Sequence, residues 1–413
     1  MEKFLLLIFF LIPVNSLYAQ KDFGLIILQH ANIIDGISNK PIRNVTLSIA
    51  NGKIINIQKH FRGPASKALI IDLAGKWLLP GYIDAHVHIS SFESAQAALA
   101  AGATTIRIMG GSRFFDTTLR NAHNAGVVNL PDVVASGYQI RPDLDAAIFI
   151  DFPSLIDLKP RLSGIENVRR VVRANVEHRV DLIKVLATER SGTPQTDPNK
   201  QTFTDEELKA IVDEARKAGL AVAAHAQSDS GARAAAQAGV RSIEHGNHLS
   251  NETLKMIKAR DIFLVVTSSL DTNTLRSARD TAAEVKNNPI LAERRRSFSR
   301  SAKKEIANAY QMGISIVGGT DAVYTLTNGF KITQVAAVLV ESGLPPMQAI
   351  KAITSRAAQC LQIADHTGAI KIGFDADIVI VGANPLKNIK ALQDVQIILN
   401  DGEIIKQLKS ALQ

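Results

Sequence analysis

Two patterns of hydrophobic and polar residues divide the chain into three blocks. Residues 24–76 alternate short β-rich runs with turns, and Asn51-Gly52 between two apolar runs predicts a hairpin. From residue 77 to about 330 the rhythm changes, because short apolar runs alternate with segments of helical pattern. From about residue 367 the β-rich pattern returns, with a second hairpin signal at Asp401-Gly402. The two ends therefore resemble each other and differ from the middle.

The middle block contains eight expected strands. One covers residues 78–85, and the others read "TTIRIM", "DVVASG", "DLIKVLA", "AVAAHA", "RSIEHG", "FLVVTS" and "ISIVGG". Between "DLIKVLA" and "AVAAHA" we expect a helix, since Thr204 and Glu207 form a capping-box pattern and Gly219 suits its end. Eight strands in about 250 residues match the size of a (β/α)8 barrel.

The predicted fold class is α/β, with a (β/α)8 TIM-like barrel and a small β-sandwich domain formed from both chain ends. The barrel is expected over residues 77–366. Residues 20–76 and 367–413 are expected to form the N-terminal and C-terminal parts of the β-sandwich domain. In this organisation the barrel is inserted into the smaller domain.

The first 19 residues carry a targeting pattern. Lys3 is followed by the apolar run "FLLLIFFLIPV", which is too short to span a bilayer, and then by "NSLYAQ". We expect a secretory signal peptide over residues 1–19, cleaved after Ala19, with cleavage after Ser16 as the alternative. The protein is then periplasmic or secreted, without a stable membrane anchor after leader removal. The single cysteine, Cys360, rules out an intramolecular disulfide.

Composition and charge narrow the range of partners. Hydrophobic residues make up 46% and charged residues 21% of the chain, which is typical of a globular protein and not of a disordered one. The net charge of +8 is spread along the chain, and no basic stripe interleaved with aromatic residues indicates a nucleic-acid site. We expect a small-molecule substrate and no nucleic acid, and leave a homo-oligomer open.

Metal-competent side chains follow several of the expected strands. "LLPGYIDAHVHI" places His86 and His88 two residues apart, so strand alternation directs both to the same side. His225 ends "VAAHA", His245 ends "SIEHG" and Asp321 ends "VGGTD". Active sites of barrels form at the carboxyl ends of their strands, and imidazole with carboxylate suits zinc or a similar divalent metal. A polar strand end or a hydrogen-bonded core histidine is the alternative at each position, but the repetition favours a metal site.

Lys184 interrupts the apolar run "DLIKVLA". A buried lysine is costly unless it is paired, and burial lowers its pKa toward the neutral amine. The alternative is an edge strand with Lys184 in water, and this strand by itself does not decide between them.

The whole set of motifs resembles the amidohydrolase superfamily, particularly its imidazolonepropionase-like and Xaa-Pro dipeptidase (prolidase) branch. The resemblance covers nearly all of the chain after the leader. It is carried by "LLPGYIDAHVH", "AGATTIR", "IKVLAT", "FTDEELKAIVDEARKAGLAVAAHA", "GVRSIEHG", "GGTDA" and the tail "GLPPMQAIKAITSRAAQCL…TGAIKIGFDADIVIV".

This resemblance implies two divalent metal ions, with zinc expected, held by His86, His88, Lys184, His225, His245 and Asp321. In it, His86 and His88 bind the more buried metal, and His225 and His245 bind the second. The lysine, carboxylated by CO2, bridges both metals. The aspartate contacts the first metal and serves as the proton shuttle.

The implied activity is binuclear metal-dependent hydrolysis of an amide C–N bond by metal-bound hydroxide, with a dipeptide or an N-acyl amino acid as substrate. A cyclic-amide or lactone hydrolase and a deaminase are the alternatives within the superfamily. A periplasmic binding protein without catalysis is the alternative from another class.

Departures from the family pattern concern the substrate side. Arg107-Ile108 stands where members often have Arg-Asp, so a carboxylate that could support a metal ligand is expected to be missing. Arg141 could clamp a substrate carboxylate or be a solvated loop residue. The loop 189–202 could be a lid or a plain surface loop. The candidates for lining the pocket are Tyr138, Arg141, Tyr324 and Asn328.

Overall fold

Eight parallel strands form the middle of the molecule. The computed structural model describes residues 24–59, 68–192, 194–267, 288–325 and 331–407, so the expected leader lies outside the described residues. Each strand expected between residues 78 and 318 is present. They are β6 (Tyr82–Val87), β7 (Ala103–Ile108), β8 (Asp132–Ala135), β9 (Leu182–Leu186), β10 (Ala221–Ala226), β11 (Ser242–His245), β12 (Phe263–Val266) and β13 (Ile316–Gly318).

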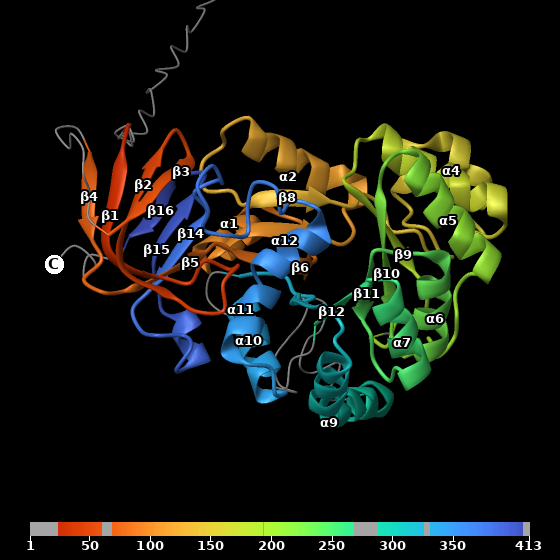
Figure 1. Cartoon of the computed structure of the whole chain (residues 1–413). Coiled ribbons are helices and arrows are strands. Elements are labelled where there is room, and N and C mark those ends of the chain that lie inside the picture. The colour runs from red at the N-terminus through yellow and green to blue at the C-terminus, as the bar shows by residue number, and fades with distance from the viewer. Residues whose placement is uncertain (1–23, 60–67, 193, 268–287, 326–330, 408–413) are drawn as a thin grey trace, which may run out of the picture.

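These strands belong to two sheets, in the orders β6-β7-β8 and β13-β12-β11-β10-β9 (Figure 1). Single bridges join the sheets: Ile140 pairs with Val185 at one side, and Val87 pairs with Ala322 at the other. The strands thus follow one another in the order of a barrel, but the described residues do not form a closed ladder. The prediction of a barrel is therefore confirmed only in part.

One cause of the gap lies just after β8. The N–H of Gly137 donates to the carboxylate of Asp116 at 2.7 Å, and the N–H of Tyr138 donates to Oδ1 of Asn175 at 2.8 Å. These buried side chains take backbone donors that a ladder with β9 would otherwise use. Pairing resumes at Ile140, whose N–H donates to the carbonyl of Lys184 at 2.8 Å.

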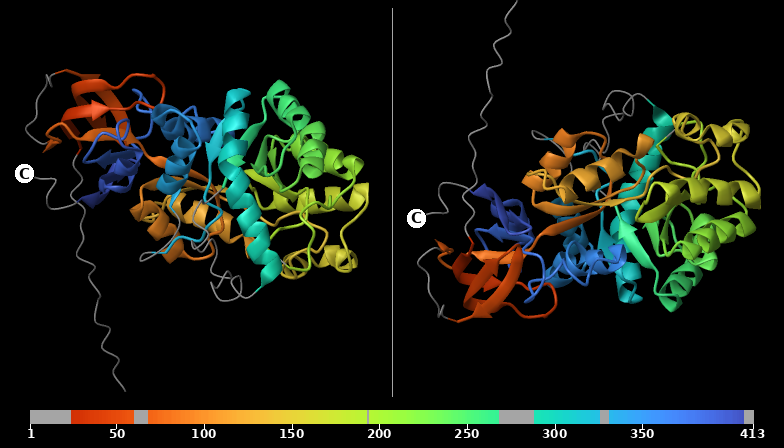
Figure 2. Two further views of the ribbon diagram at one scale, coloured as in Figure 1. Left: turned by 90° about the horizontal axis from the view of Figure 1, so that it is seen from below. Right: turned by 90° about the horizontal axis from the view of Figure 1, so that it is seen from above.

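Helices flank the two sheets (Figures 1 and 2). The helix predicted after "DLIKVLA" is α5 (Asp205–Lys217), and its capping box between Thr204 and Glu207 is confirmed. The left-handed φ of +74° at Gly219 follows its end. Among the described helices, none is long and apolar enough to cross a membrane. The other described α-helices are α1 (Phe92–Ala100), α2 (Phe115–Asn124), α3 (Ile148–Asp151), α4 (Ile165–Glu177), α6 (Asp229–Ala238), α7 (Asn251–Ala259), α9 (Pro289–Gln311), α10 (Ile332–Glu341), α11 (Pro346–Ala352) and α12 (Ser355–Leu361).

Both chain ends build one mixed sheet, in the order β16-β15-β14-β5-β1-β2-β3 with β4 beside β1. The sequence predicts a sandwich at this place, whereas the described strands are hydrogen-bonded into a single sheet. Its strands are β1 (Ile26–Ile33), β2 (Ile42–Ala50), β3 (Lys53–Gln58), β4 (Leu69–Asp72), β5 (Trp77–Pro80), β14 (Ile378–Val381), β15 (Val395–Asn400) and β16 (Glu403–Gln407).

Strand β14 connects this sheet to the parallel strands. Ile378 and Ile380 pack in the core of the mixed sheet, while Val379 and Val381 belong to the large core that includes residues of the parallel sheets. Period-2 alternation places the two pairs on opposite faces, and both faces are buried. The strand therefore reads as an uninterrupted apolar run.

Both predicted hairpins are confirmed, and their tips touch. Asn51 and Gly52 have φ values of +50° and +72°, and Asp401 and Gly402 have values of +50° and +77°. These are the left-handed conformations that a two-residue hairpin turn needs. A Cβ at Gly402 would lie 2.8 Å from the Cα of Gly52, so the contact also requires glycine.

An ion-pair cluster joins helix α2 and strand β8 to the second hairpin. Nε2 of His123 lies 3.0 Å from Asp132 and 3.2 Å from Asp401, and its Nδ1 lies 3.1 Å from the carbonyl of Leu130. Both ring nitrogens therefore face acceptors, as expected of the charged imidazolium. The hydrogen bonds to Asp132 and Asp401 raise the pKa of His123 to about 10.

Replacing His123 by asparagine is expected to destabilise the protein most at pH 6. The folded pKa is raised, so the stabilisation is complete below the unfolded pKa of about 6.5 and is lost as the pH rises through about 10. We expect a loss of about 1–2 kcal/mol at pH 6, because Asp401 is half exposed and solvent screens the pair. Denaturant unfolding of both proteins at pH 6 and pH 10.5 tests this, and an equal difference at the two pH values would contradict it.

Candidate active site

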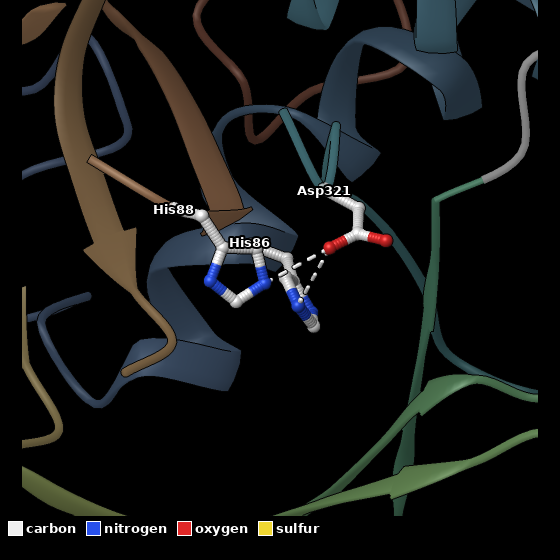
Figure 3. Close-up of side chains that lie close together, drawn as sticks. All are labelled: His86, His88 and Asp321. Carbon is white, nitrogen blue, oxygen red and sulfur yellow. Dashed lines mark ion pairs between the residues drawn. The ribbon is translucent and has the colours of Figure 1, made fainter. Parts of the chain in front are cut away.

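Three predicted metal ligands meet at the carboxyl ends of β6 and β13. Nε2 of His88 lies 3.0 Å and Nε2 of His86 lies 3.4 Å from the same oxygen of Asp321 (Figure 3). One ligand atom from each of these residues, called here the metal trio, lies within 4.8 Å of the others. Separations of 3.0–3.4 Å are the distances between ligands that share one ion with bonds of about 2.0–2.2 Å.

One member of the metal trio is buried, and the other two are partly exposed to solvent. The side chain of His86 is 1% exposed, whereas those of His88 and Asp321 are 33% and 26% exposed. The site is therefore accessible to solvent on the side of His88 and Asp321, and His86 forms its buried floor.

Asp84 holds the loop that carries Asp321. Its buried carboxylate accepts hydrogen bonds from the N–H of Thr320 at 3.0 Å, from the hydroxyl of Thr320 at 2.7 Å and from the hydroxyl of Tyr324 at 2.8 Å. Asp321 itself has a left-handed φ of +56°, and its N–H donates to the carbonyl of His86 at 2.7 Å. Burial raises the pKa of Asp84 to about 6, although these hydrogen bonds oppose the shift.

Behind His86 lies a buried pair of opposite charges. Nδ1 of His86 lies 2.7 Å from Oε2 of Glu244, and Nη2 of Arg107 donates to both oxygens of this carboxylate at 2.9 and 3.0 Å. All three side chains are at most 2% exposed. Burial raises the pKa of Glu244, but the positive charge of Arg107 and the hydrogen bond with His86 outweigh it and lower the pKa.

The predicted ligands of the second metal lie beside the trio. The ring centroids of His225 and His245 are 4.6 Å apart, and those of His86 and His245 are 5.0 Å apart. Nδ1 of His245 lies 2.7 Å from the hydroxyl oxygen of Thr267. Nε2 of His225 is buried, with no hydrogen-bond partner among the residues that the structure describes.

Lys184 is buried in the middle of β9, at 2% exposure, and is not the solvated edge residue of the alternative reading. Its Nζ is also buried without a hydrogen-bond partner within the described part of the chain. Burial lowers the pKa of Lys184 to about 7, with Arg107 adding to the shift and Glu244 opposing it. A substantial share of the amine is thus in its neutral, nucleophilic form near neutral pH.

The electrostatics suit a cation. Burial lowers the pKa of His86 to about 4 and holds those of His225 and His245 well below 6.5, so the three rings are neutral at pH 7. Burial alone would raise the pKa of Asp321, but the hydrogen bond from His88 and the nearby imidazoles keep it well below its usual value. Neutral imidazole and ionised carboxylate are the forms that bind metal.

The residues predicted to line the pocket have protein partners. The hydroxyl of Tyr138 donates to Asp151 at 2.6 Å, and that of Tyr324 donates to Asp84. Nε of Arg141 donates to the carbonyl of Asp143 in its own loop. Asn328 lies outside the described residues. Contact of these four with a substrate stays a prediction.

The two ends of the loop 189–202 are bonded to each other, and the loop also contacts helix α9. Thr188 and Gln201 form a bridge at its base, and Lys200 pairs with Glu189 at 2.9 Å. Arg294 of helix α9 donates to the carbonyls of Ser191 and Thr196. These contacts hold the loop against α9, and a lid movement stays a prediction.

Glu244 is not among the residues that the sequence motifs assign to the site. Ile108 follows Arg107 where a family member often has aspartate, so no carboxylate in support of the metal ligands is expected from the sequence. The structure supplies the carboxylate from β11 instead. Charges of opposite sign inside "TTIRIM" and "SIEHG", two strands that are otherwise apolar, are the signal that could have indicated the pair.

Parallel strands that bring imidazole and carboxylate side chains together at their carboxyl ends define a class of barrel enzymes with a metal site. Residues 77–410 match the amidohydrolase family. The chain belongs to this family, which confirms the resemblance seen in its motifs. It is a metal-dependent hydrolase that acts on carbon–nitrogen amide bonds.

Three named relatives illustrate the similarity. Ochratoxinase of Aspergillus niger is 25% identical, over 91% of this chain and 85% of that enzyme. Imidazolonepropionase of Kosmotoga olearia is 24% identical, over 83% of this chain and 85% of that enzyme. The crystal structure of a Xaa-Pro dipeptidase with methionine bound in its active site is 26% identical, with a TM-score of 0.81, over 92% of this chain and 100% of that one.

Proposed function

We propose that the protein is a binuclear metal hydrolase that cleaves the amide bond of a dipeptide or an N-acyl amino acid. The observation that carries the proposal is the pair of buried nitrogen atoms beside the metal trio. Nζ of Lys184 and Nε2 of His225 have no hydrogen-bond partner in the described part of the chain, and such burial is costly unless a ligand completes it. The residues present therefore fit two divalent metal ions, with zinc expected.

His86, His88 and Asp321 would hold the first ion, and His225 and His245 the second. The neutral amine of Lys184 would attack CO2, form an N–C bond and release one proton, which gives a carbamate with two oxygen atoms. This modification would turn a buried nitrogen without a partner into an anionic oxygen ligand for the ions. It would account for a lysine in the middle of a buried strand.

The bound ions would lower the pKa of water toward neutrality and polarise the carbonyl of the substrate. Asp321 would accept a proton from the attacking water and deliver it to the departing nitrogen as the C–N bond breaks. Its position supports this role, since one oxygen faces His86 and His88 and the side chain is partly exposed on the open side of the site. His86, which is closed off from solvent, would serve only as a ligand.

The substrate class rests on the relatives. One solved structure that resembles this chain is a Xaa-Pro dipeptidase with methionine in its active site, so an amino acid fits the site of that protein. We propose by analogy that the group released here is an amino acid. Imidazolonepropionase is also among the relatives, so hydrolysis of a cyclic amide is the second candidate.

We also propose that residues 1–19 direct the protein to the periplasm or the exterior. The run "FLLLIFFLIPV" followed by "NSLYAQ" supports this. Mass spectrometry of the exported protein from its native host tests the proposal. A mature chain beginning at Gln20 is expected, and an intact leader on the cytoplasmic protein would contradict it.

A substrate screen tests the proposed function. The leader-free, zinc-loaded protein is incubated with panels of dipeptides, N-acyl amino acids and cyclic amides, and release of amine or carboxylate is followed. Turnover of a dipeptide or an N-acyl amino acid is expected. Turnover of cyclic amides alone would replace the substrate class with the second candidate, and metal binding without any turnover would favour a binding protein.

A further inference from the structure

We propose that Glu244, held by Arg107, is a positioning residue that sets which nitrogen of His86 faces the metal and strengthens that ligand. The inference rests on the proposed function in one respect, namely that His86 binds a metal ion. It assigns a role to two buried charged residues, Arg107 and Glu244, that have no part in the proposed reaction.

The geometry decides the tautomer of His86. Oε2 of Glu244 lies 2.7 Å from Nδ1, and an ionised carboxylate can only accept a hydrogen bond. Nδ1 must therefore carry a hydrogen, so Nε2 is the ring nitrogen that can offer a lone pair to a metal. Nε2 is the atom that lies 3.4 Å from Asp321 within the metal trio. The carboxylate thus directs the donor atom of His86 into the site.

Arg107 fixes the carboxylate in turn. Its Nη2 donates to both oxygens of Glu244, and its Nε donates to the carbonyl of Ala85, one residue before His86, at 2.6 Å. The hydroxyl of Ser242 donates to Oε1 of Glu244 at 2.5 Å. Glu244 is therefore saturated with donors from several directions, and its orientation toward His86 is determined.

The three residues come from strands of both parallel sheets. His86 is on β6 and Arg107 is on β7 of the three-stranded sheet, whereas Glu244 is on β11 of the five-stranded sheet. The ladder between the sheets is limited to single bridges, so this buried network adds a link across the interior. It ties the orientation of a metal ligand to the alignment of the two sheets.

His86 differs from His245 in its partner. The ring of His245 is paired with a neutral hydroxyl, that of Thr267. A carboxylate increases the basicity of the imidazole that it holds, and loss of such a partner typically lowers metal affinity about 10–100-fold. The metal bound by His86 is therefore expected to depend on Glu244.

The test replaces Glu244 by glutamine, which keeps the shape and an acceptor oxygen but removes the charge. Zinc affinity is measured by competition with a chromogenic chelator, and the cobalt-substituted protein is followed by its visible absorption spectrum. We expect about 10–100-fold weaker binding of one of two ions and an altered cobalt spectrum. Glu207→Gln is the control, because Glu207 is also a buried glutamate, at 8% exposure, in the capping box of α5 and lies outside the site.

A second variant separates positioning from folding. Glu244→Gln leaves Arg107 buried without its counter-charge, which could destabilise the protein by itself. Arg107→Met combined with Glu244→Gln removes that unpaired charge. We expect the double variant to regain stability, measured by urea unfolding, while metal binding stays weak.

Parent-like zinc affinity in Glu244→Gln, or recovery of affinity in the double variant, would overturn the inference and leave the proposed function intact. A parent protein that binds no metal would overturn both. The two failures are therefore distinguishable, because failure of the proposed function shows as absence of metal in the parent protein, whereas failure of the inference shows only in the variants.

Discussion

Asp321→Asn is expected to lower kcat by about 10²–10⁴-fold or more, the range for loss of a general acid–base group. The asparagine amide cannot accept a proton from water at neutral pH, and it is a weaker metal ligand than a carboxylate. The measurement is steady-state hydrolysis of the best substrate from the screen, with the metal content of each sample determined in parallel.

Asp213→Asn is the control for this prediction. Asp213 lies on the surface of α5 and pairs with Lys209, so its loss should leave kcat unchanged. Parent-like turnover in Asp321→Asn would contradict the assignment of Asp321 as proton shuttle. Lost turnover with both metals retained would favour the shuttle role over a role in metal binding alone.

Lys184→Ala is expected to remove one of the two metal ions and to reduce turnover by more than the about 10–100-fold that is typical when only a partner of a metal ligand is lost. The reason is that the carbamate on Lys184 is the proposed bridge between the ions. Without metal, the variant is expected to be at least as stable as the parent, because the substitution removes a buried amine without a partner. Metal analysis and urea unfolding measure the two effects.

Lys184→Glu tests the same bridge from the other direction. A glutamate supplies a carboxylate without CO2, so partial retention of the second ion is expected. Lys209→Ala, at an exposed lysine of α5, is the control. Two tightly bound ions in Lys184→Ala would contradict the carbamate bridge.

Much of the framework could be predicted from local signals. An apolar run such as "FLVVTS" has few alternatives to a buried strand once helices flank it, and Asn51-Gly52 has the two residues that tolerate the φ values of its turn. The capping box of α5 is equally local. These features depend on neighbours in sequence, and the structure confirms them.

Features that depend on distant partners could not be predicted in this way. The single bridge between Ile140 and Val185 reflects the side chains of Asp116 and Asn175, which take backbone donors after β8. The hydroxyl of Tyr138, a predicted pocket residue, donates to Asp151, which lies in a different segment of the chain, and its contact with a substrate stays a prediction. Only the folded structure shows which partner each polar atom has.

Backbone conformation explains the missed role of Glu244. Strict alternation directs Glu244 and His245 to opposite faces of β11. A metal site that contains His245 would then lie on the face away from Glu244. His245 has a left-handed φ of +70°, which breaks the alternation at the strand end. Both side chains therefore reach His86: Glu244 contacts its Nδ1 at 2.7 Å, and the ring centroid of His245 lies 5.0 Å from that of His86.

The metal content of the purified, leader-free chain, measured together with its amide hydrolysis, tests the proposed function most directly. We expect two divalent ions per chain, loss of hydrolysis after a chelator removes them, and recovery when zinc is added back. Hydrolysis that persists in the metal-free protein, or a chain that binds no divalent metal, would contradict the proposed function.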